Sequence, residues 1–208
     1  TFELGSADGV MFCTMELIDG ESLTSRLAQR RRLPVNEAVP IAIAMCQALE
    51  AAHAAGVIHR DIKPDNVLLA HDGRVVLADF GVAAVAAAEG ELSGTLAYMA
   101  PEQARGEAPT PAADVYAVGA VLFEMLAGRR AFAGDFAAIL AAKQDLDHVA
   151  AGPVDAPAEL AQVIAQATAR DREQRIASAA ALARALASWA RPARAPTQPH
   201  ARPAVDSD

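Results

Sequence analysis

The strongest indication of the fold lies in the stretch His59-Arg60-Asp61-Ile62-Lys63-Pro64-Asp65-Asn66. Two shorter segments follow it along the chain, Asp79-Phe80-Gly81 and Ala100-Pro101-Glu102. The apolar pair Val57-Ile58 precedes the stretch, so Asp61 is expected in a loop at the end of a short apolar segment. A carboxylate in such a loop can accept the proton of an attacking hydroxyl group.

The residues between Asn66 and Asp79 predict a β-hairpin. Apolar runs at residues 67–70 and 75–78 are separated by His71-Asp72-Gly73-Arg74, a turn sequence typical of hairpins. Because a hairpin returns the chain to its starting point, the side chains of Asn66 and Asp79 should converge. Both carry oxygen donors which, with phosphate oxygens and water, suit Mg²⁺. The plain alternative is that these are ordinary loop and turn residues.

In this order and spacing, the three segments resemble the signature motifs of the eukaryotic-type protein kinases, in particular the bacterial serine/threonine kinases. The resemblance covers about residues 1–190. It implies an α+β, protein-kinase-like fold with a mostly helical C-terminal lobe at residues 21–190. Residues 1–20 would be a two-strand remnant of the N-terminal lobe and hinge, and residues 191–208 a disordered linker rich in proline and alanine.

The resemblance also implies an activity, which is transfer of the γ-phosphoryl group of ATP to serine or threonine hydroxyls of protein substrates. Asp61 would be the catalytic base and Lys63 would stabilise the transferring phosphate. Thr95 matches a residue that contacts both of them and favours hydroxyl-bearing acceptors. Asn66 and Asp79 would hold Mg²⁺, and Asp79 would thereby also bind the nucleotide.

Adenine contacts are implied for a second group of residues. In the family, the backbone of Glu16-Leu17-Ile18 would form the hinge that bonds adenine, with Met15 as gatekeeper. Leu68 would lie beneath the adenine ring. The alternative for the apolar members of this group is simple core packing.

Other matches to the family concern architecture. Asp114 is the only charge in the first half of an otherwise apolar helix, so it should be hydrogen bonded, because an unpaired buried charge is costly. The family implies that its partner is the backbone around His59-Arg60-Asp61. It also implies an ion pair between Glu102 and Arg175. His53 is predicted to be a packed residue at a helix end rather than a metal ligand.

The remaining elements follow from local patterns. Residues 1–20 predict a hairpin around Asp8-Gly9. A helix is expected from a cap at Asn36, with Pro40 in its first turn, to Gly56, and a buried helix from Thr110-Pro111 to Gly128. Further expectations are helices near residues 157–168 and 178–189 and a long loop at residues 82–109.

Composition excludes several function classes. The chain has 208 residues, 52 of them alanine, and a net charge of −8, which argues against a nucleic-acid-binding surface. No apolar run of membrane-spanning length and no signal peptide is visible, so no membrane contact is expected in this segment. Cys13 and Cys46 lie in apolar runs and predict buried, reduced thiols of a cytoplasmic protein, or of the cytoplasmic part of a membrane-anchored kinase.

The sequence also departs from the kinase pattern. It contains no GxGxxG segment, and its only lysines are Lys63 and Lys143. We therefore expect either the C-terminal part of a longer kinase or a naturally reduced one. Two other functions compete, a pseudokinase-like binding module and a small-molecule phosphotransferase of the antibiotic-kinase type. Arg60 could hold a phosphate on the loop at residues 82–94, where Ser93 is the only hydroxyl, or could instead pair with Glu89 or Glu91.

Overall fold

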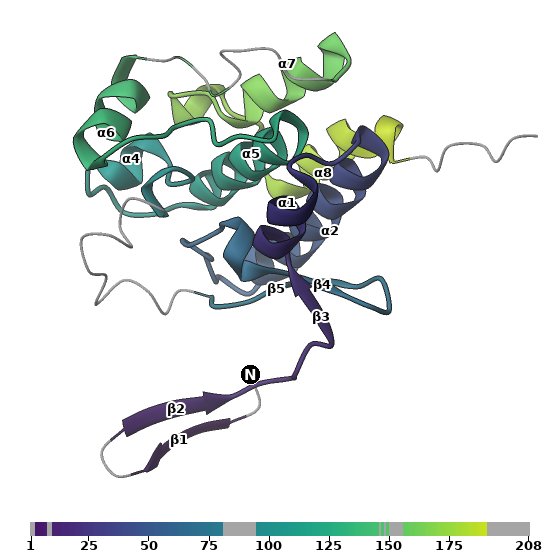
Figure 1. Cartoon of the computed structure of the whole chain (residues 1–208). Helices are drawn as coiled ribbons and strands as arrows, with labels where there is room; N and C mark the ends of the chain where they lie inside the picture. Colours follow the sequence, from purple (N-terminus) through teal and green to yellow (C-terminus); the bar gives the residue numbers. More distant parts are fainter. Residues whose placement is uncertain are drawn as a thin grey trace, which may run out of the picture.

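The computed structural model describes residues 3–7, 10–80, 95–145, 147, 149 and 156–190. The body is mostly helical, with a small three-stranded sheet beneath the helices and a hairpin that projects away from them (Figure 1). The strands are β1 (Glu3–Ala7), β2 (Val10–Thr14), β3 (Gly20–Ser22), β4 (Val67–Ala70) and β5 (Val75–Leu77). The α-helices are α1 (Leu23–Arg30), α2 (Val35–Ala54), α4 (Pro101–Ala104), α5 (Pro111–Ala127), α6 (Phe136–Asp145), α7 (Ala158–Ala167) and α8 (Ala179–Leu186). Short 3₁₀ turns occur at η1 (Pro64–Asn66), η3 (Arg172–Gln174) and η4 (Ala187–Trp189).

Both predicted hairpins are present. In the first, β1 pairs with β2 in antiparallel register, with Ala7 opposite Val10. In the second, β4 pairs with β5, and Val67 lies opposite Leu77. The short strand β3, which the sequence did not reveal, adds to the other edge of β4. Its Gly20 leaves no room for a side chain, because a Cβ there would lie 2.1 Å from the carbonyl oxygen of Leu69.

Helix α2 confirms the predicted segment but corrects its start. The helix begins at Val35, and its N-cap is Pro34, whose carbonyl accepts from the N–H groups of Glu37 and Ala38. The expected cap, Asn36, is therefore inside the first turn. Pro40 lies beyond that turn, on the exposed side of the helix, where water can bond the Asn36 carbonyl that the proline leaves without a donor. Gly56 ends the segment as expected, with a φ of +75°.

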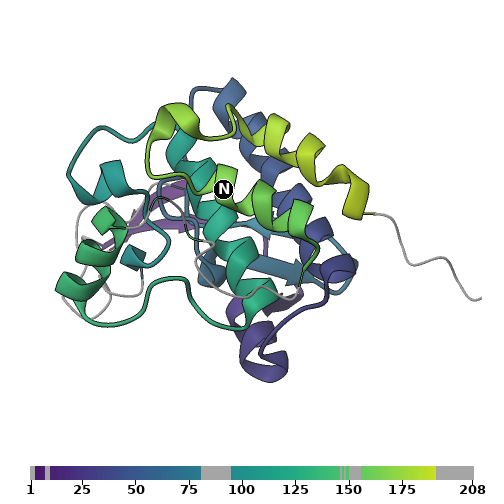
Figure 2. The ribbon, with the colours of Figure 1, turned by 90° about the horizontal axis from the view of Figure 1, so that it is seen from above.

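Helix α5 is the central element of the body, as its apolar sequence predicted. It packs against α2, α7 and α8, and Figure 2 shows it surrounded by the other helices. It begins after Thr110 and ends at Gly128, which adopts a left-handed conformation with a φ of +67°. Thr110 occupies the N-cap position, but its buried hydroxyl has no hydrogen-bond partner among the described residues, so it does not act as a side-chain cap.

Helices α7 and α8 confirm the predicted C-terminal helices, and the Ser178 side chain caps α8. The expected loop at residues 82–109 is wrong in its last part, which contains α4. Residues 81–94 and 191–208 lie outside the described residues, so the predictions for Glu89, Glu91, Ser93 and the linker are not addressed. Cys46 is buried, and burial raises the pKa of its thiol to about 12. In the described ranges, no helix has the length and apolarity needed to span a bilayer.

Candidate active site

The loop at residues 59–66 connects α2 to β4 and is fastened to α5 through Asp114. The Asp114 carboxylate, 1% exposed, accepts hydrogen bonds from the backbone N–H groups of His59 at 2.9 Å and Arg60 at 3.0 Å. This confirms the predicted bonding of Asp114. It also accepts from Nε2 of His53 at 2.7 Å, a bond that sequence reasoning missed. Helices α2 and α5 therefore fix the loop together.

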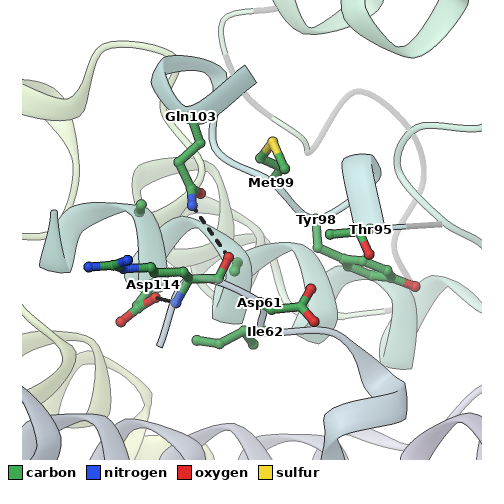
Figure 3. Close-up of a pocket in the computed structure, with 10 residues that line it drawn as sticks. Asp61, Ile62, Thr95, Tyr98, Met99, Gln103 and Asp114 are labelled. Atoms are coloured by element: carbon green, nitrogen blue, oxygen red, sulfur yellow. Dashed lines mark hydrogen bonds between the residues drawn. The ribbon is translucent and has the colours of Figure 1, made fainter. Parts of the chain in front are cut away.

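The backbone around the site is strained at two positions. Arg60 has a φ of +72° and Asp79 a φ of +60°, both in the left-handed region that costs a side-chain-bearing residue about 1–2 kcal/mol. Arg60 is held on both sides, because its N–H donates to Asp114 and its carbonyl accepts from Nε2 of Gln103 at 3.3 Å (Figure 3). Gln103, from α4, is a second positioning contact that the sequence did not indicate.

The two oxygens of the Asp61 carboxylate have different surroundings. Oδ2 accepts from Nζ of Lys63 at 2.9 Å and from Nδ2 of Asn66 at 3.0 Å. Asn66 Nδ2 also donates to the main-chain carbonyl of Asp61 at 2.8 Å, which locks the two residues together. Oδ1 is buried and has no hydrogen-bond partner within the described part of the chain. Since a buried polar oxygen without a partner is costly, Oδ1 is an acceptor that lacks only a donor.

Thr95 closes the group. Nζ of Lys63 donates to Thr95 Oγ1 at 3.1 Å, so Asp61, Lys63, Asn66 and Thr95 form one hydrogen-bonded cluster. Beside it lies a cavity of about 10 Å³, which we call the acceptor cavity and which is the size of one water molecule. Its lining includes Arg60, Asp61, Thr95, Tyr98, Met99 and Gln103 (Figure 3).

The candidate metal donors lie at the end of the β4–β5 hairpin. The N–H of Ala78 donates to the carbonyl of Asn66 at 2.9 Å, so Asp79, the next residue, begins beside Asn66. Asn66 is buried and Asp79 is exposed. Among the described residues, no group of three or more histidine, cysteine and acidic side chains is arranged to hold a metal. Two oxygen donors completed by phosphates and water are nevertheless a usual environment for Mg²⁺.

His59 contacts both the loop and Phe80. Its ring packs against Phe80 with centroids 4.4 Å apart, and its Nδ1 accepts from the N–H of Asp61 at 3.4 Å. Burial lowers the pKa of His59 below its ordinary value, although the nearby Asp114 acts in the opposite direction. The imidazole is therefore neutral at pH 7 and serves as a packed acceptor.

The residues predicted to contact adenine are not joined to this cluster. The Glu16 carboxylate pairs with Arg74 at 2.9 Å, and Leu17 is 94% exposed. Met15 is half-exposed, while Ile18 and Leu68 are partly buried. The nucleotide roles of Glu16, Ile18 and Leu68 stay predictions.

The predicted ion pair between Glu102 and Arg175 is confirmed. The guanidinium binds the carboxylate with two parallel bonds of 2.5 and 2.7 Å, and both side chains are buried. Burial raises the pKa of Glu102, but the bonds from Arg175 and the backbone outweigh it, so this pKa lies below its usual value. The pair joins α4, at the end of the segment that carries Thr95, to the chain before α8.

Comparison with known proteins agrees with this geometry. Residues 3–186 match the model of the protein kinase domain. The serine/threonine-protein kinase PknL of Mycobacterium tuberculosis is 41% identical over 179 residues, which is 82% of this chain and 45% of PknL. PknA of the same organism is 39% identical over 92% of this chain and 46% of its own length. A serine/threonine-protein kinase of Corynebacterium efficiens, drp72, is 37% identical over 99% of this chain and 40% of its own length. The chain thus spans a little under half the length of these relatives.

Proposed function

The chain belongs to the protein kinase family, and from this membership we propose that it is the catalytic part of a kinase that transfers the γ-phosphoryl group of ATP to serine or threonine hydroxyls of proteins. The observation that carries the proposal is the buried Oδ1 of Asp61, which has no hydrogen-bond partner among the residues that the structure describes. Its partner oxygen, Oδ2, is already engaged by Lys63 and Asn66, so the carboxylate is held in one orientation with one acceptor available.

The proposed chemistry uses this oxygen as the base. The acceptor hydroxyl donates to Oδ1, which fixes the direction of its lone pair and takes the proton as the oxygen attacks the γ-phosphorus. The bond from the γ-phosphorus to the bridging oxygen breaks, and ADP leaves. Lys63 lies between Asp61 and Thr95, so its positive charge is next to the position where the attacking oxygen and the phosphoryl group meet.

The donor set also fits the magnesium ion that kinases use with ATP. Asn66 Nδ2 is occupied by Asp61, which leaves its Oδ1 as the ligand atom, and Asp79 offers an exposed carboxylate beside it. Magnesium, when bound, neutralises phosphate charge and orients the phosphates. The positive φ of Asp79 is consistent with a role in which its carboxylate must be aimed, because backbone strain of this kind clusters at active sites.

The competing functions are less well supported. A non-catalytic binding module has no use for a base with a buried, unpaired oxygen, and the Lys63–Thr95 bond adds a contact specific to the protein-kinase pattern.

The substrates are therefore proteins with accessible serine or threonine. A cytoplasmic location fits ATP chemistry and the buried free thiol of Cys46.

The test is Asp61→Asn, measured in the full gene product. We expect kcat to fall by about 10²–10⁴, the contribution of a positioned acid–base group, with little change in ATP affinity. The matched control is Asp65→Asn, the same substitution on an exposed side chain of the same loop, which should leave kcat unchanged. An Asp61→Asn protein with normal turnover would exclude Asp61 as the base.

A further inference from the structure

Lys143, on α6, is an unusual buried cation that the proposed chemistry does not use. Its side chain is 1% exposed, although lysine is almost never fully buried unless it is paired. Nζ donates to the carbonyl oxygens of Met99 at 2.8 Å and Ala97 at 3.3 Å, and lies 3.2 Å from the hydroxyl of Tyr116. In the part of the chain that the structure describes, the hydrogen-bond partners of this ammonium are thus main-chain and hydroxyl oxygens.

Two aromatic rings complete the surroundings of Nζ. The ammonium lies over the ring of Phe132, 4.1 Å from its centroid, and over that of Tyr116 at 4.9 Å. Carbonyl oxygens and ring faces attract a cation without neutralising it. Burial nevertheless lowers the pKa of Lys143 to about 7, with a further decrease from Arg175 and an opposing effect of Glu102. Even a neutral amine keeps two N–H donors, enough to bond both carbonyls.

The carbonyls that Lys143 holds belong to the segment that contributes Tyr98 and Met99 to the wall of the acceptor cavity. Ala97 and Met99 flank Tyr98, and both Tyr98 and Met99 line that cavity. The segment is fastened at its start by Thr95, which bonds Lys63, and at its end by Glu102, which bonds Arg175. Lys143 holds the middle of the segment through its bonds to the carbonyls of Ala97 and Met99.

Tyr116 contacts both Lys143 and Arg175, the residues that hold the middle and the end of this segment. Its ring carries the Arg175 guanidinium at 5.0 Å from the centroid as well as the Lys143 ammonium. Tyr116 is itself 2% exposed, on the rigid central helix α5. The residues that hold the middle and the end of the segment at residues 95–102 thus both contact the Tyr116 side chain in the core.

A purely structural role does not account for the choice of lysine. Methionine has a similar length, packs well in irregular cores and carries no desolvation cost. What methionine cannot do is bond the carbonyls of Ala97 and Met99, which point into the core. Taking the proposed function as given, we propose that Lys143 is a positioning residue that holds the main chain of residues 97–99, so that Tyr98 and Met99 shape the side of the acceptor cavity on which the hydroxyl-bearing segment of a protein substrate binds.

The first test does not depend on activity. Hydrogen exchange is measured for the amides of Tyr98 and Met99, which are both bonded to the Thr95 carbonyl. In Lys143→Met these amides should exchange about tenfold faster, the factor expected for a lost hydrogen bond, while amides of α2 and α8 remain unchanged. The control is Leu182→Ala, which removes a buried side chain of α8 and should loosen α2 and α8 first. Equal acceleration throughout the molecule, or none at Tyr98 and Met99, would overturn the proposal.

Tyr116→Phe provides a milder variant should Lys143→Met fail to fold. It removes only the hydroxyl that contacts Nζ, so the same two amides should accelerate by a smaller factor, about two- to fivefold. Unchanged exchange in this variant would count against the positioning role.

The second test separates the binding of the two substrates in the full gene product. In Lys143→Met, KM for a protein acceptor should rise about tenfold, while KM for ATP changes by less than about twofold, because Lys143 holds the segment that contributes Tyr98 and Met99 to the acceptor cavity. Equal effects on both KM values would contradict positioning. If the wild type transfers no phosphate at all, the proposed function fails, whereas the exchange result still decides the role of Lys143.

Discussion

The carboxylates of this chain act differently according to which of their oxygens are already bonded. Asp114 has both oxygens bonded, Oδ2 to His53 and His59 and Oδ1 to Arg60, so it fixes the loop. Asp61 has one oxygen held and one without a partner in the described part of the chain, which is the condition for a base. The motif predicted the residue types and their proximity. It could not predict Gln103 or Lys143, because their acceptors are main-chain carbonyls, which every residue has and no sequence pattern marks.

The titration of Lys143 gives a prediction at this scale. Its pKa of about 7 lies below the ordinary value of 10.5, so between these values the unfolded chain binds a proton that the folded chain has released. Stability should therefore rise with pH in this window, by up to about 1.4 kcal/mol per pH unit. The wild type should gain stability relative to Lys143→Met between about pH 7 and 10, as measured by urea unfolding.

The comparison of the wild type with Lys143→Met isolates the titration of Lys143. Both proteins contain the other ionisable groups near Nζ, which are Arg175, Glu102 and Tyr116. Parallel pH profiles would show that the carbonyls and the rings of Phe132 and Tyr116 keep the ammonium charged.

At the scale of elements, the long helices α2 and α5 followed from the sequence, as did the hairpin of β4 and β5, whereas α1, α6 and β3 did not. Helices α2 and α5 carry sustained apolar patterns and terminal glycines, so their existence was predictable. Length alone does not explain this, because α1 and the predicted α8 both have eight residues. Strand β3 pairs with β4, which lies far from it along the sequence, so no local turn pattern marks the pairing. The start of α2 was misplaced because Pro34 supplies the cap through its carbonyl, whereas Asn36 has the side chain typical of a cap.

The pair of Glu102 and Arg175 joins two of these elements, and we expect strong coupling between them. Arg175→Ala leaves a buried carboxylate without its partner and should lower the free energy of unfolding by roughly 3–5 kcal/mol. The double variant with Glu102→Ala should cost less than the sum of the single variants. The control is Arg105→Ala, which breaks an exposed pair with Glu107 and should cost about 1 kcal/mol or less. Additive losses in urea unfolding would refute the coupling.

This contribution also has a defined pH dependence. Because the pKa of Glu102 is held below its ordinary value of 4.5, the pair stabilises the fold above about pH 4.5. The stabilisation should be lost as the pH falls through the lowered value. Arg175→Ala should flatten the acid limb of the stability profile, and an unchanged limb would assign acid sensitivity to other groups.

A second prediction concerns the contact between α5 and α7. A Cβ on Gly119 would lie 2.6 Å from Cγ2 of Thr168 and 3.0 Å from Cβ of Ala167. Gly119→Ala should therefore destabilise the fold by about 1–3 kcal/mol through overpacking, despite the better helix propensity of alanine. Thr168→Ser removes the clashing methyl and keeps the hydroxyl that bonds Ile164 and Val149, so it should recover part of the loss. No recovery in the melting temperature would show that Ala167 is the limiting contact.

At the scale of the whole molecule, both lysines of the sequence already make other contacts. Lys63 bonds Asp61 and Thr95, and Lys143 is enclosed in the core. The sequence therefore has no further lysine that could bind the nucleotide phosphates in addition to Lys63. It also has no glycine-rich loop to cover these phosphates.

We therefore expect the 208-residue chain, purified alone, to transfer phosphate no faster than its own Asp61→Asn variant. Joining it to a segment that carries a glycine-rich loop and a lysine should restore a difference between the two. The measurement is incorporation of labelled phosphate into a protein acceptor. Activity of the unextended chain well above that of Asp61→Asn would mean that the C-terminal lobe alone suffices.

The attachment of the loop to Asp114 has a consequence for how the protein is made. The bonded backbone of Arg60 precedes Asp114 by 54 residues. Ribosomes add about 5–20 residues per second, so the loop is synthesised about 3–11 s before the carboxylate that shapes it. Until Gln103 is made, 43 residues after Arg60, the left-handed turn at Arg60 has neither of the two contacts that hold it. A nascent chain stalled before residue 103 should therefore show no native structure in this loop, however completely α2 has formed.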